Sequence, residues 1–251
     1  MSEIGKYPII DLHTCIQGEG KYAGIPHVLI RLSGCNLKCQ FKENICDTPY
    51  SSWFPEHGNF SVRDVEDLFR KHNQIKHTFI TGGEPFLFPG ITEELIQISK
   101  KYNHFVAAET NGTLYETLSF DFVTISPKLN NSIPIEGSKT TDPNGNLYSV
   151  SKNDTVKHSK NRLKLPVLKL LIQTYSYQLK FVIQDESDIE EALSLSDQLE
   201  VPRDKIYLMP EGITNLQIQE RRKWLIEKCI SYGVNYSDRL HILAYGDKRE
   251  A

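Results

Sequence analysis

The sequence predicts an α/β fold in which helices cover a largely parallel sheet. Short aliphatic runs alternate about six times with segments of helical periodicity, the pattern of strand–helix units. Unusual clusters of Gly, Pro and charged residues each follow one of the aliphatic runs directly. The carboxyl ends of parallel strands carry the ligand-binding loops of such folds. Right-handed crossovers leave two arrangements open, a barrel or a doubly wound layer.

The predicted strands are short runs rich in β-branched and aliphatic residues, bounded by turn residues. The first ends at Gly34 and leads directly into a loop that contains three cysteines. A final apolar piece near the carboxyl terminus is expected to be extended as well. The strand predictions cover residues 27–33, 77–80, 105–108, 122–125, 178–183, 206–209 and 241–244.

The predicted helices show apolar residues at helical spacing. Ser61 offers an N-cap to the first helix, which begins at Val62. Further helices are expected at 91–98, 167–175, 189–199 and 216–232. Residues 129–162 are polar and predict a long loop or insertion, a kind of segment that is usually functional or disordered. Because the alternation resumes afterwards, we expect residues 1–251 to form a single domain.

Composition excludes several classes of protein. The formal net charge is only −3, and no basic run suggests a nucleic-acid binder. The apolar stretches are too short to span a bilayer, and the first residues lack the features of a signal peptide. We therefore expect a cytoplasmic protein with no nucleic-acid or membrane partner.

Three of the five cysteines, Cys35, Cys39 and Cys46, fall within twelve residues. Three thiolates in one loop can hold three corners of a 4Fe–4S cube and leave one iron open. A structural zinc site is an alternative, with a fourth ligand from His27 or a distant residue. Free structural thiols are another, although free cysteines are usually buried singly. Single burial is the expectation for Cys229 and the favoured one for Cys15.

Seven short motifs occur in one order along the chain: QGEG at 17–20, RLSGCN at 31–36, CDT at 46–48, TGGEP at 81–85, ETNG at 109–112, SPK at 126–128 and LHIL at 240–243. In this order they resemble the radical S-adenosylmethionine superfamily and, within it, the 7-carboxy-7-deazaguanine synthases. The resemblance covers nearly the whole chain. It implies a partial (β/α)6-type TIM barrel.

The resemblance also implies chemistry. Members split S-adenosylmethionine at the open iron into methionine and a 5′-deoxyadenosyl radical. In these synthases the radical abstracts hydrogen from 6-carboxytetrahydropterin, and a magnesium-assisted ring contraction expels ammonia on the route to queuosine and other 7-deazaguanine bases. The cofactor performs such reactions, while the protein binds, orients and excludes water. The implied assembly is a homodimer served by a reductant such as flavodoxin or ferredoxin.

Site residues follow from the resemblance by position. The cluster ligands would be Cys35, Cys39 and Cys46, and Thr48 would bind magnesium. Contacts to S-adenosylmethionine would come from Asp47, Gly82, Gly83, Glu84, Glu109, Asn111, Ser126, Pro127, Lys128, Met209, Pro210 and Glu211. The pterin site would use Ile16, Gln17, Gly18, Arg31, Thr81 and the carboxylate of Ala251, with the planar fork of Arg31 suited to the substrate carboxylate.

Structural roles without a part in catalysis remain possible for several of these residues. Arg31 and Lys128 could be surface charges, and Thr48 could merely cap the next segment. Lys180 could be buried near the site or face solvent. The remaining acidic candidates could be solvated turn residues or helix caps: Glu19, Glu84 and Glu109.

Two departures from the family pattern concern the cysteine loop. Six residues separate Cys39 from Cys46, where the usual spacing has two, and we interpret the extra residues as an insertion. The residue before the last cysteine is commonly aromatic and lies against adenine, but here it is Ile45. Phe41 could take over that contact.

Two other functions remain alternatives at this point. One is an activase that installs a glycyl radical on a partner protein. Such an activase has no small-molecule carboxylate site, so Arg31 and the Gln17 loop argue against it. The other is a non-catalytic binding module stabilised by zinc or iron.

Overall fold

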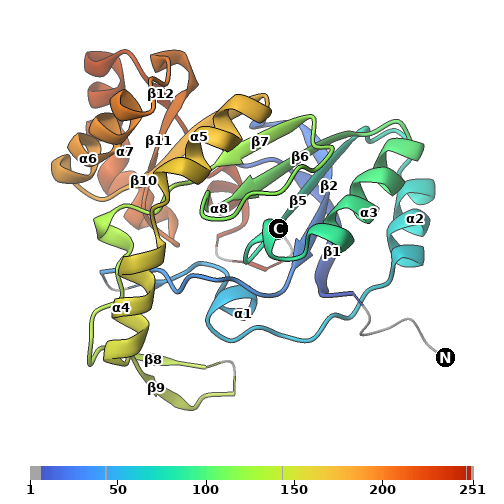
Figure 1. The fold of residues 1–251 in the computed structure, drawn as a ribbon, viewed down its shortest axis with the longest axis horizontal. Coiled ribbons are helices and arrows are strands. Elements are labelled where there is room, and N and C mark those ends of the chain that lie inside the picture. Colours follow the sequence, from blue (N-terminus) through green and yellow to red (C-terminus); the bar gives the residue numbers. More distant parts are fainter. Residues whose placement is uncertain (1–6, 43, 143, 247, 250–251) are drawn as a thin grey trace.

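The computed structural model describes residues 7–42, 44–142, 144–246 and 248–249. Its centre is an eight-stranded sheet (Figure 1) with the strand order β1-β2-β5-β6-β7-β10-β11-β12. Only the β1–β2 pair is antiparallel, and the remaining neighbours run parallel. The strands are β1 (Ile9–Ile16), β2 (Pro26–Leu32), β5 (His77–Gly82), β6 (Phe105–Thr110), β7 (Phe122–Ile125), β10 (Tyr177–Ile183), β11 (Ile206–Pro210) and β12 (Asn235–Tyr236).

The order of the parallel strands follows the order of the chain. A doubly wound layer needs a point where that order reverses, and this sheet has none, so the doubly wound alternative is wrong. The partial (β/α)6 barrel is confirmed, with β2, β5, β6, β7, β10 and β11 as its six main parallel strands. Among the described residues the sheet stays open, with β1 and β12 at its edges.

Right-handed connections between sequential neighbours place the helices on one face of the sheet. Figure 1 shows them in chain order around it, from α2 and α3 at one end to α6 and α7 at the other. The predicted cap of α2 is confirmed, because Ser61 and Asp64 form a reciprocal capping box. The helices are α2 (Val62–Lys71), α3 (Pro89–Lys101), α5 (Leu165–Thr174), α6 (Glu186–Gln198) and α7 (Asn215–Tyr232).

The core lies between this layer of helices and the sheet. Ile80 and Ile125 from neighbouring parts of the sheet are fully buried, as are Leu95 of α3 and Leu225 of α7. Burial of such side chains contributes about 1.5–3 kcal/mol each. The apolar faces therefore fix the strand ends in a common edge, where the functional loops begin.

One sequence expectation is wrong, and one of the two alternatives for another segment is excluded. Residues 241–244 belong to a helix, α8 (Leu240–Tyr245), and not to an extended piece. Its apolar run was too short to show a period, and only Ile242 is buried there. For the segment 129–162 the loop alternative is excluded, and the insertion alternative stays. The segment contains the hairpin of β8 (Lys139–Thr141) and β9 (Leu147–Ser149) and the helix α4 (Lys152–Asn161), which project from the body of the molecule (Figure 1).

Three short elements accompany the cysteine loop. A two-stranded antiparallel ladder joins β3 (Gln40–Phe41) to β4 (Asn44–Ile45), and α1 (Pro49–Ser52) follows the last cysteine of the loop. Their position directly after β2 puts them at the carboxyl edge of the sheet.

Candidate active site

A cavity of about 530 Å³ opens at the carboxyl ends of the parallel strands. That volume falls in the range of small-molecule sites. Residues from the loops after β2, β5, β6, β7 and β11 line it, together with residues of β1, β10 and α8. Because parallel strands end at one edge, loops far apart in sequence share this cavity.

The cysteine loop brings its last two cysteines together through a hairpin. The residues between Cys39 and Cys46 form the β3–β4 ladder, in which Gln40 pairs with Ile45. At its base the Cys46 backbone N–H donates to the Cys39 carbonyl over 3.0 Å. The ladder therefore carries the extra residues outward and leaves its two ends adjacent. The long gap between these cysteines thus becomes a short distance in space.

Neighbouring loops hold the cysteine loop in place. The Trp53 indole N–H donates to the Cys39 carbonyl over 2.8 Å. The Asn111 amide donates to the side chain of Asn36 over 2.9 Å and lies 3.8 Å from the Cys35 sulfur. On the far side of the hairpin, the Asn44 amide donates to the Glu211 carboxylate over 3.1 Å.

Close packing of glycines also fixes this loop. A Cβ atom on Gly83 would lie 2.0 Å from the Gly34 carbonyl oxygen and 2.5 Å from that of Ser51. Gly34 itself has a φ of +113°, a conformation that favours glycine. The backbones of the β5 loop and the cysteine loop can therefore approach only because these positions lack side chains.

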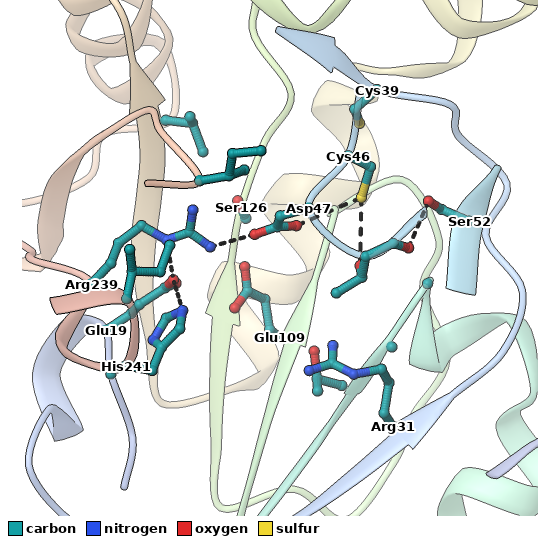
Figure 2. Close-up of a pocket in the computed structure, with 18 of the residues that line it drawn as sticks. Glu19, Arg31, Cys39, Cys46, Asp47, Ser52, Glu109, Ser126, Arg239 and His241 are labelled. Atoms are coloured by element: carbon teal, nitrogen blue, oxygen red, sulfur yellow. Dashed lines mark hydrogen bonds and ion pairs between the residues drawn. The ribbon is translucent and has the colours of Figure 1, made fainter. Parts of the chain in front are cut away.

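The donor set fits a cluster with three protein ligands. Cys35, Cys39 and Cys46 all line the cavity, and Figure 2 shows Cys39 and Cys46 close together on its wall. Burial raises the pKa of Cys35 to about 12 and also raises the pKa values of the other two thiols. Without iron these thiols stay protonated, so loading a cluster displaces their protons. Within the described ranges, no three His, Cys, Asp or Glu side chains are placed to hold a single metal ion.

A buried network of charges forms the opposite wall. Lys180 of β10 contacts the carboxylates of Glu19 and Glu109, and its side chain is only 3% exposed. Arg239 donates to the Glu19 carboxylate over 2.9 Å, and also to the Gly212 carbonyl and the Asp47 carboxylate. These contacts link the N-terminal loop to the cysteine loop. Figure 2 shows the Arg239 guanidinium between Glu19 and Asp47.

The network controls the ionisation of its members. Burial opposes the charge of Glu19, but Lys180 and Arg239 outweigh it and hold the pKa of that carboxyl well below its usual range. Burial likewise opposes the charge of Lys180, but its two carboxylate partners outweigh it and raise the pKa of the amine. The solvated-turn reading of Glu19 and the surface reading of Lys180 are therefore wrong.

Cationic side chains gather near the N-terminal strands. The Nε of Arg31 donates to Asp11 over 2.7 Å, and Arg249 donates to the other oxygen of that carboxylate over 2.8 Å. Asp11 is buried, so it fixes both guanidinium groups. Among the described residues the terminal nitrogens of Arg31 have no hydrogen-bond partner, and Arg31, Lys248 and Arg249 all line the cavity.

Thr48 is the N-cap residue of α1, but its side chain forms no cap hydrogen bond within the described part of the chain. Its hydroxyl instead lies 3.5 Å from the Cys46 sulfur, on the cavity wall. The capping alternative does not account for this hydroxyl.

The structure brings most of the predicted site residues to one cavity. The predicted residues that line it, besides the three cysteines and Thr48, are Ile16, Gln17, Gly18, Arg31, Asp47, Thr81, Gly82, Gly83, Glu109, Asn111, Ser126, Lys128, Met209 and Glu211. Three others, Glu84, Pro127 and Pro210, adjoin lining residues without lining it themselves. Ala251 lies outside the described residues. Phe41 and Ile45 also line the cavity.

Glu84 has a structural role. It is fully buried, and its oxygens accept from the backbone N–H groups of Phe86 and Asn111 and from the Thr110 hydroxyl. Burial raises the pKa of its carboxyl to about 7. The solvated-turn reading is wrong, and the side chain joins the ends of β5 and β6.

Sequence reasoning missed several lining residues. Arg239 follows an edge strand of two residues that carried no sequence signal, and Lys248 and Arg249 lie in the poorly matching C-terminal segment. Cys15 is not simply packed: its sulfur lies 3.4 Å from the His27 imidazole, and both residues line the cavity. Gly18 lies close to His241, so the structure brings the QGEG and LHIL motifs together at the cavity.

Comparisons with known proteins identify the family. The model of the radical SAM superfamily matches residues 29–125. A 7-carboxy-7-deazaguanine synthase of Halobacterium salinarum is 34% identical over 97% of this chain and 92% of its own. The chain belongs to the 7-carboxy-7-deazaguanine synthase family. A second synthase of this family, from Rhodopirellula baltica, is 37% identical over 93% of this chain and 84% of its own.

The fold of this family is also seen in a solved structure. The crystal structure of QueE from Escherichia coli matches with a TM-score of 0.61 over 92% of this chain and 93% of that one, at 22% identity. As a radical S-adenosylmethionine enzyme, the chain uses a 4Fe–4S cluster and S-adenosylmethionine, acts on a small molecule and needs a reductant. None of the described helices is long and apolar enough to cross a membrane.

Proposed function

We propose that this chain converts 6-carboxy-5,6,7,8-tetrahydropterin to 7-carboxy-7-deazaguanine with loss of ammonia. The observation that carries the proposal is that one cavity contains three thiols on one wall and the free end of Arg31 on another. Family membership supports the same reaction. A glycyl-radical activase would have no use for a half-buried guanidinium whose terminal nitrogens are available to a small carboxylate.

Cys35, Cys39 and Cys46 would hold the cluster. When bound, the cluster and S-adenosylmethionine supply a carbon radical that can abstract hydrogen. The backbone at Gly82–Glu84 would receive the methionine amino group, since glycine permits close approach. The remaining cofactor contacts would come from the predicted residues that line the cavity, with Met209 and Glu211 at the adenine.

Arg31 would orient the substrate. Asp11 holds its Nε over 2.7 Å, which directs the two terminal nitrogens toward a carboxylate in a fixed, bidentate geometry. Gln17, Gly18, Ile16 and Thr81 would surround the rest of the pterin.

Thr48 would bind magnesium through its hydroxyl, supported by Asp47. A hard cation needs few protein oxygens and takes the rest from substrate and water. The position of Thr48 next to Cys46 would place the ion beside the cofactor. The fixed charges of Lys180, Glu19 and Glu109 would form a preorganised polar wall for a reaction that changes charge.

Anaerobic reconstitution followed by product analysis tests the proposal. We expect about four irons per chain, reductive cleavage of S-adenosylmethionine, and a product with the mass of 7-carboxy-7-deazaguanine from the pterin. Cleavage without pterin turnover would contradict the synthase assignment and favour an activase. A single zinc per chain and no cleavage would favour a binding module.

A matched pair of variants tests the role of Arg31. Arg31→Gln should raise the KM for the pterin at least about tenfold, because a charged bidentate contact is lost. Cofactor cleavage without substrate should persist. Arg63→Gln, at an exposed position on α2, is the control and should leave both unchanged.

Three further features are proposed on the family resemblance alone: a homodimer, a flavodoxin or ferredoxin as reductant, and a cytoplasmic location. Light scattering of the reconstituted enzyme tests the first, donor-dependent cleavage the second, and cell fractionation the third.

A further inference from the structure

The insertion between β7 and α5 is the basic part of an acidic chain. Residues 129–162 carry five Lys or Arg and three Asp or Glu, whereas the whole chain has 29 and 32. No continuous basic run results, because other residues separate these side chains along the sequence. In the structure, α4 places its lysines and its aspartate on different faces of the helix.

The two faces of α4 differ in chemistry. At 100° per residue, its outer face carries Lys152, Lys157 and Lys160 within an arc of about 140°. All three are exposed, and none forms an ion pair with the described residues. The inner face carries Asp154 and the buried His158. We call the surface of the three lysines and the exposed Val156 the α4 outer face.

The inner face of α4 is seated on the cysteine loop. Lys38, which lies between the first two cluster cysteines, donates to Asp154 and to the Tyr148 hydroxyl, each over 2.9 Å. The Tyr148 ring packs edge-on against Trp53 with the centroids 5.8 Å apart. The insertion is therefore attached to the loop that would hold the cluster.

Apolar side chains accompany the lysines. Val156 on α4 is 53% exposed, and Ile135 and Leu147 elsewhere in the insertion are 55% and 66% exposed. Exposed apolar groups beside charged ones are typical of a surface for another protein. A nucleic-acid surface would not need them.

We propose that the α4 outer face is the docking surface for an acidic electron-transfer protein that reduces this enzyme. The inference rests on the proposed function, which requires one electron from outside the chain. That electron leaves the donor, which is oxidised by one electron, and is delivered to the cluster at the three cysteines. No bond in this chain forms or breaks. One helix diameter, about 10–12 Å, separates the docking surface from the cysteine loop.

Complementary charge would mainly raise the rate at which the two proteins associate. A positive face raises the association rate of a negative partner by about 10–10³-fold, and salt weakens the effect. Uncharged reductants of low mass, or dithionite, do not need the surface. Protein-driven and chemical reduction should therefore respond differently to changes in α4.

The test compares two triple variants of the reconstituted enzyme with equal change in charge. One is Lys152→Glu/Lys157→Glu/Lys160→Glu on α4. The control is Lys71→Glu/Lys101→Glu/Lys223→Glu, at exposed positions on α2, α3 and α7. The first readout is the Kd for an acidic flavodoxin, measured by calorimetry at low and at physiological salt.

We expect the α4 variant to raise this Kd about tenfold or more at low salt, and the control to change it less than about twofold. Salt should weaken binding to the wild-type chain more than binding to the α4 variant. With dithionite, both variants should form 5′-deoxyadenosine at the wild-type rate. Equal effects of the two variants on the Kd would overturn the proposal, as would slower dithionite-driven cleavage in the α4 variant alone.

Two other outcomes are distinguishable. Loss of affinity for a short RNA duplex in the α4 variant, with unchanged flavodoxin binding, would assign the face to nucleic acid and overturn the proposal. If the wild-type chain fails to cleave S-adenosylmethionine with dithionite, the proposed function fails, whereas the binding data still decide where a flavodoxin docks.

Discussion

Replacement of Lys180 by Met is a direct test of the buried charge network. Met retains most of the volume of Lys but removes its charge. Lys180 lies 2.7 Å from Glu109 and also contacts Glu19, with its side chain 3% exposed. The Lys180→Met variant would leave Glu109 without a cationic partner among the described residues, while Glu19 would keep Arg239.

The expected loss of stability follows from that geometry. Removing one member of a buried ion pair leaves an uncompensated charge and costs about 3–5 kcal/mol. Glu109 is about a quarter exposed, so partial hydration should place the loss at the lower end, about 3 kcal/mol. Glu109→Gln should restore much of it in the double variant, because the isolated negative charge disappears.

Urea denaturation of the cluster-free chain measures these changes. A double-variant cycle should give a coupling free energy of about 2 kcal/mol between Lys180 and Glu109. Lys169→Met, at an exposed position on α5, is the control for loss of a lysine charge. Additive effects of the two substitutions, within about 0.5 kcal/mol, would refute the account of the network given above.

Three further predictions concern other parts of the structure. Thr48→Ala should abolish stimulation by magnesium while cofactor cleavage persists; equal loss of both would contradict the ligand role. Gly83→Ala should cost at least about 3 kcal/mol in urea denaturation, because its Cβ would meet the Gly34 carbonyl, while Gly90→Ala, with open space around it, should be nearly neutral. Burial lowers the pKa of His104 to about 4, so the contribution of this histidine to stability should fall by about 1–2 kcal/mol as the pH drops from about 6.5 to about 4. His104→Gln should make the slope of urea midpoints against pH shallower but not flat, because burial also lowers the pKa values of His27 and His158 to about 4. An unchanged slope would exclude His104 as a cause.

The positions after the parallel strands could be predicted from the sequence, and the physical reason is topological. Thr81 and Ser126 come from different strands, but each follows an aliphatic run, and parallel strands end at a common edge. The edge could therefore be identified without coordinates. The side chains that face these residues across the cavity could be identified only from the structure.

The unpredicted part of the site comes from residues whose local sequence carries no period. Arg239 follows a strand of two residues, and α8 contains one buried apolar residue, Ile242. Glu19 could be recognised as part of a motif, but its charge state depends on Lys180 and Arg239, which lie far away in the chain. Such pairings are decided by tertiary packing and are absent from any short window of sequence.

The insertion at 129–162 is a second case in which the local sequence did not reveal the structure. Its polar composition suggested a loop, because no apolar period marks the hairpin or α4. The capping box of Ser151 and Asp154 and the contact of Lys38 with Asp154 supply the stabilisation instead. A short helix can thus form where capping and one charged contact replace an apolar face.

The ladder between Cys39 and Cys46 has a consequence for finding similar enzymes in genomes. Each further rung would add two residues, one on either side, and leave the sulfur-bearing ends where they are. Counts between these cysteines should consequently grow in steps of two, with turn residues at the midpoint. A search that demands a fixed interval would pass over such chains, whereas one that admits even-numbered intervals flanked by strand-forming residues would retain them.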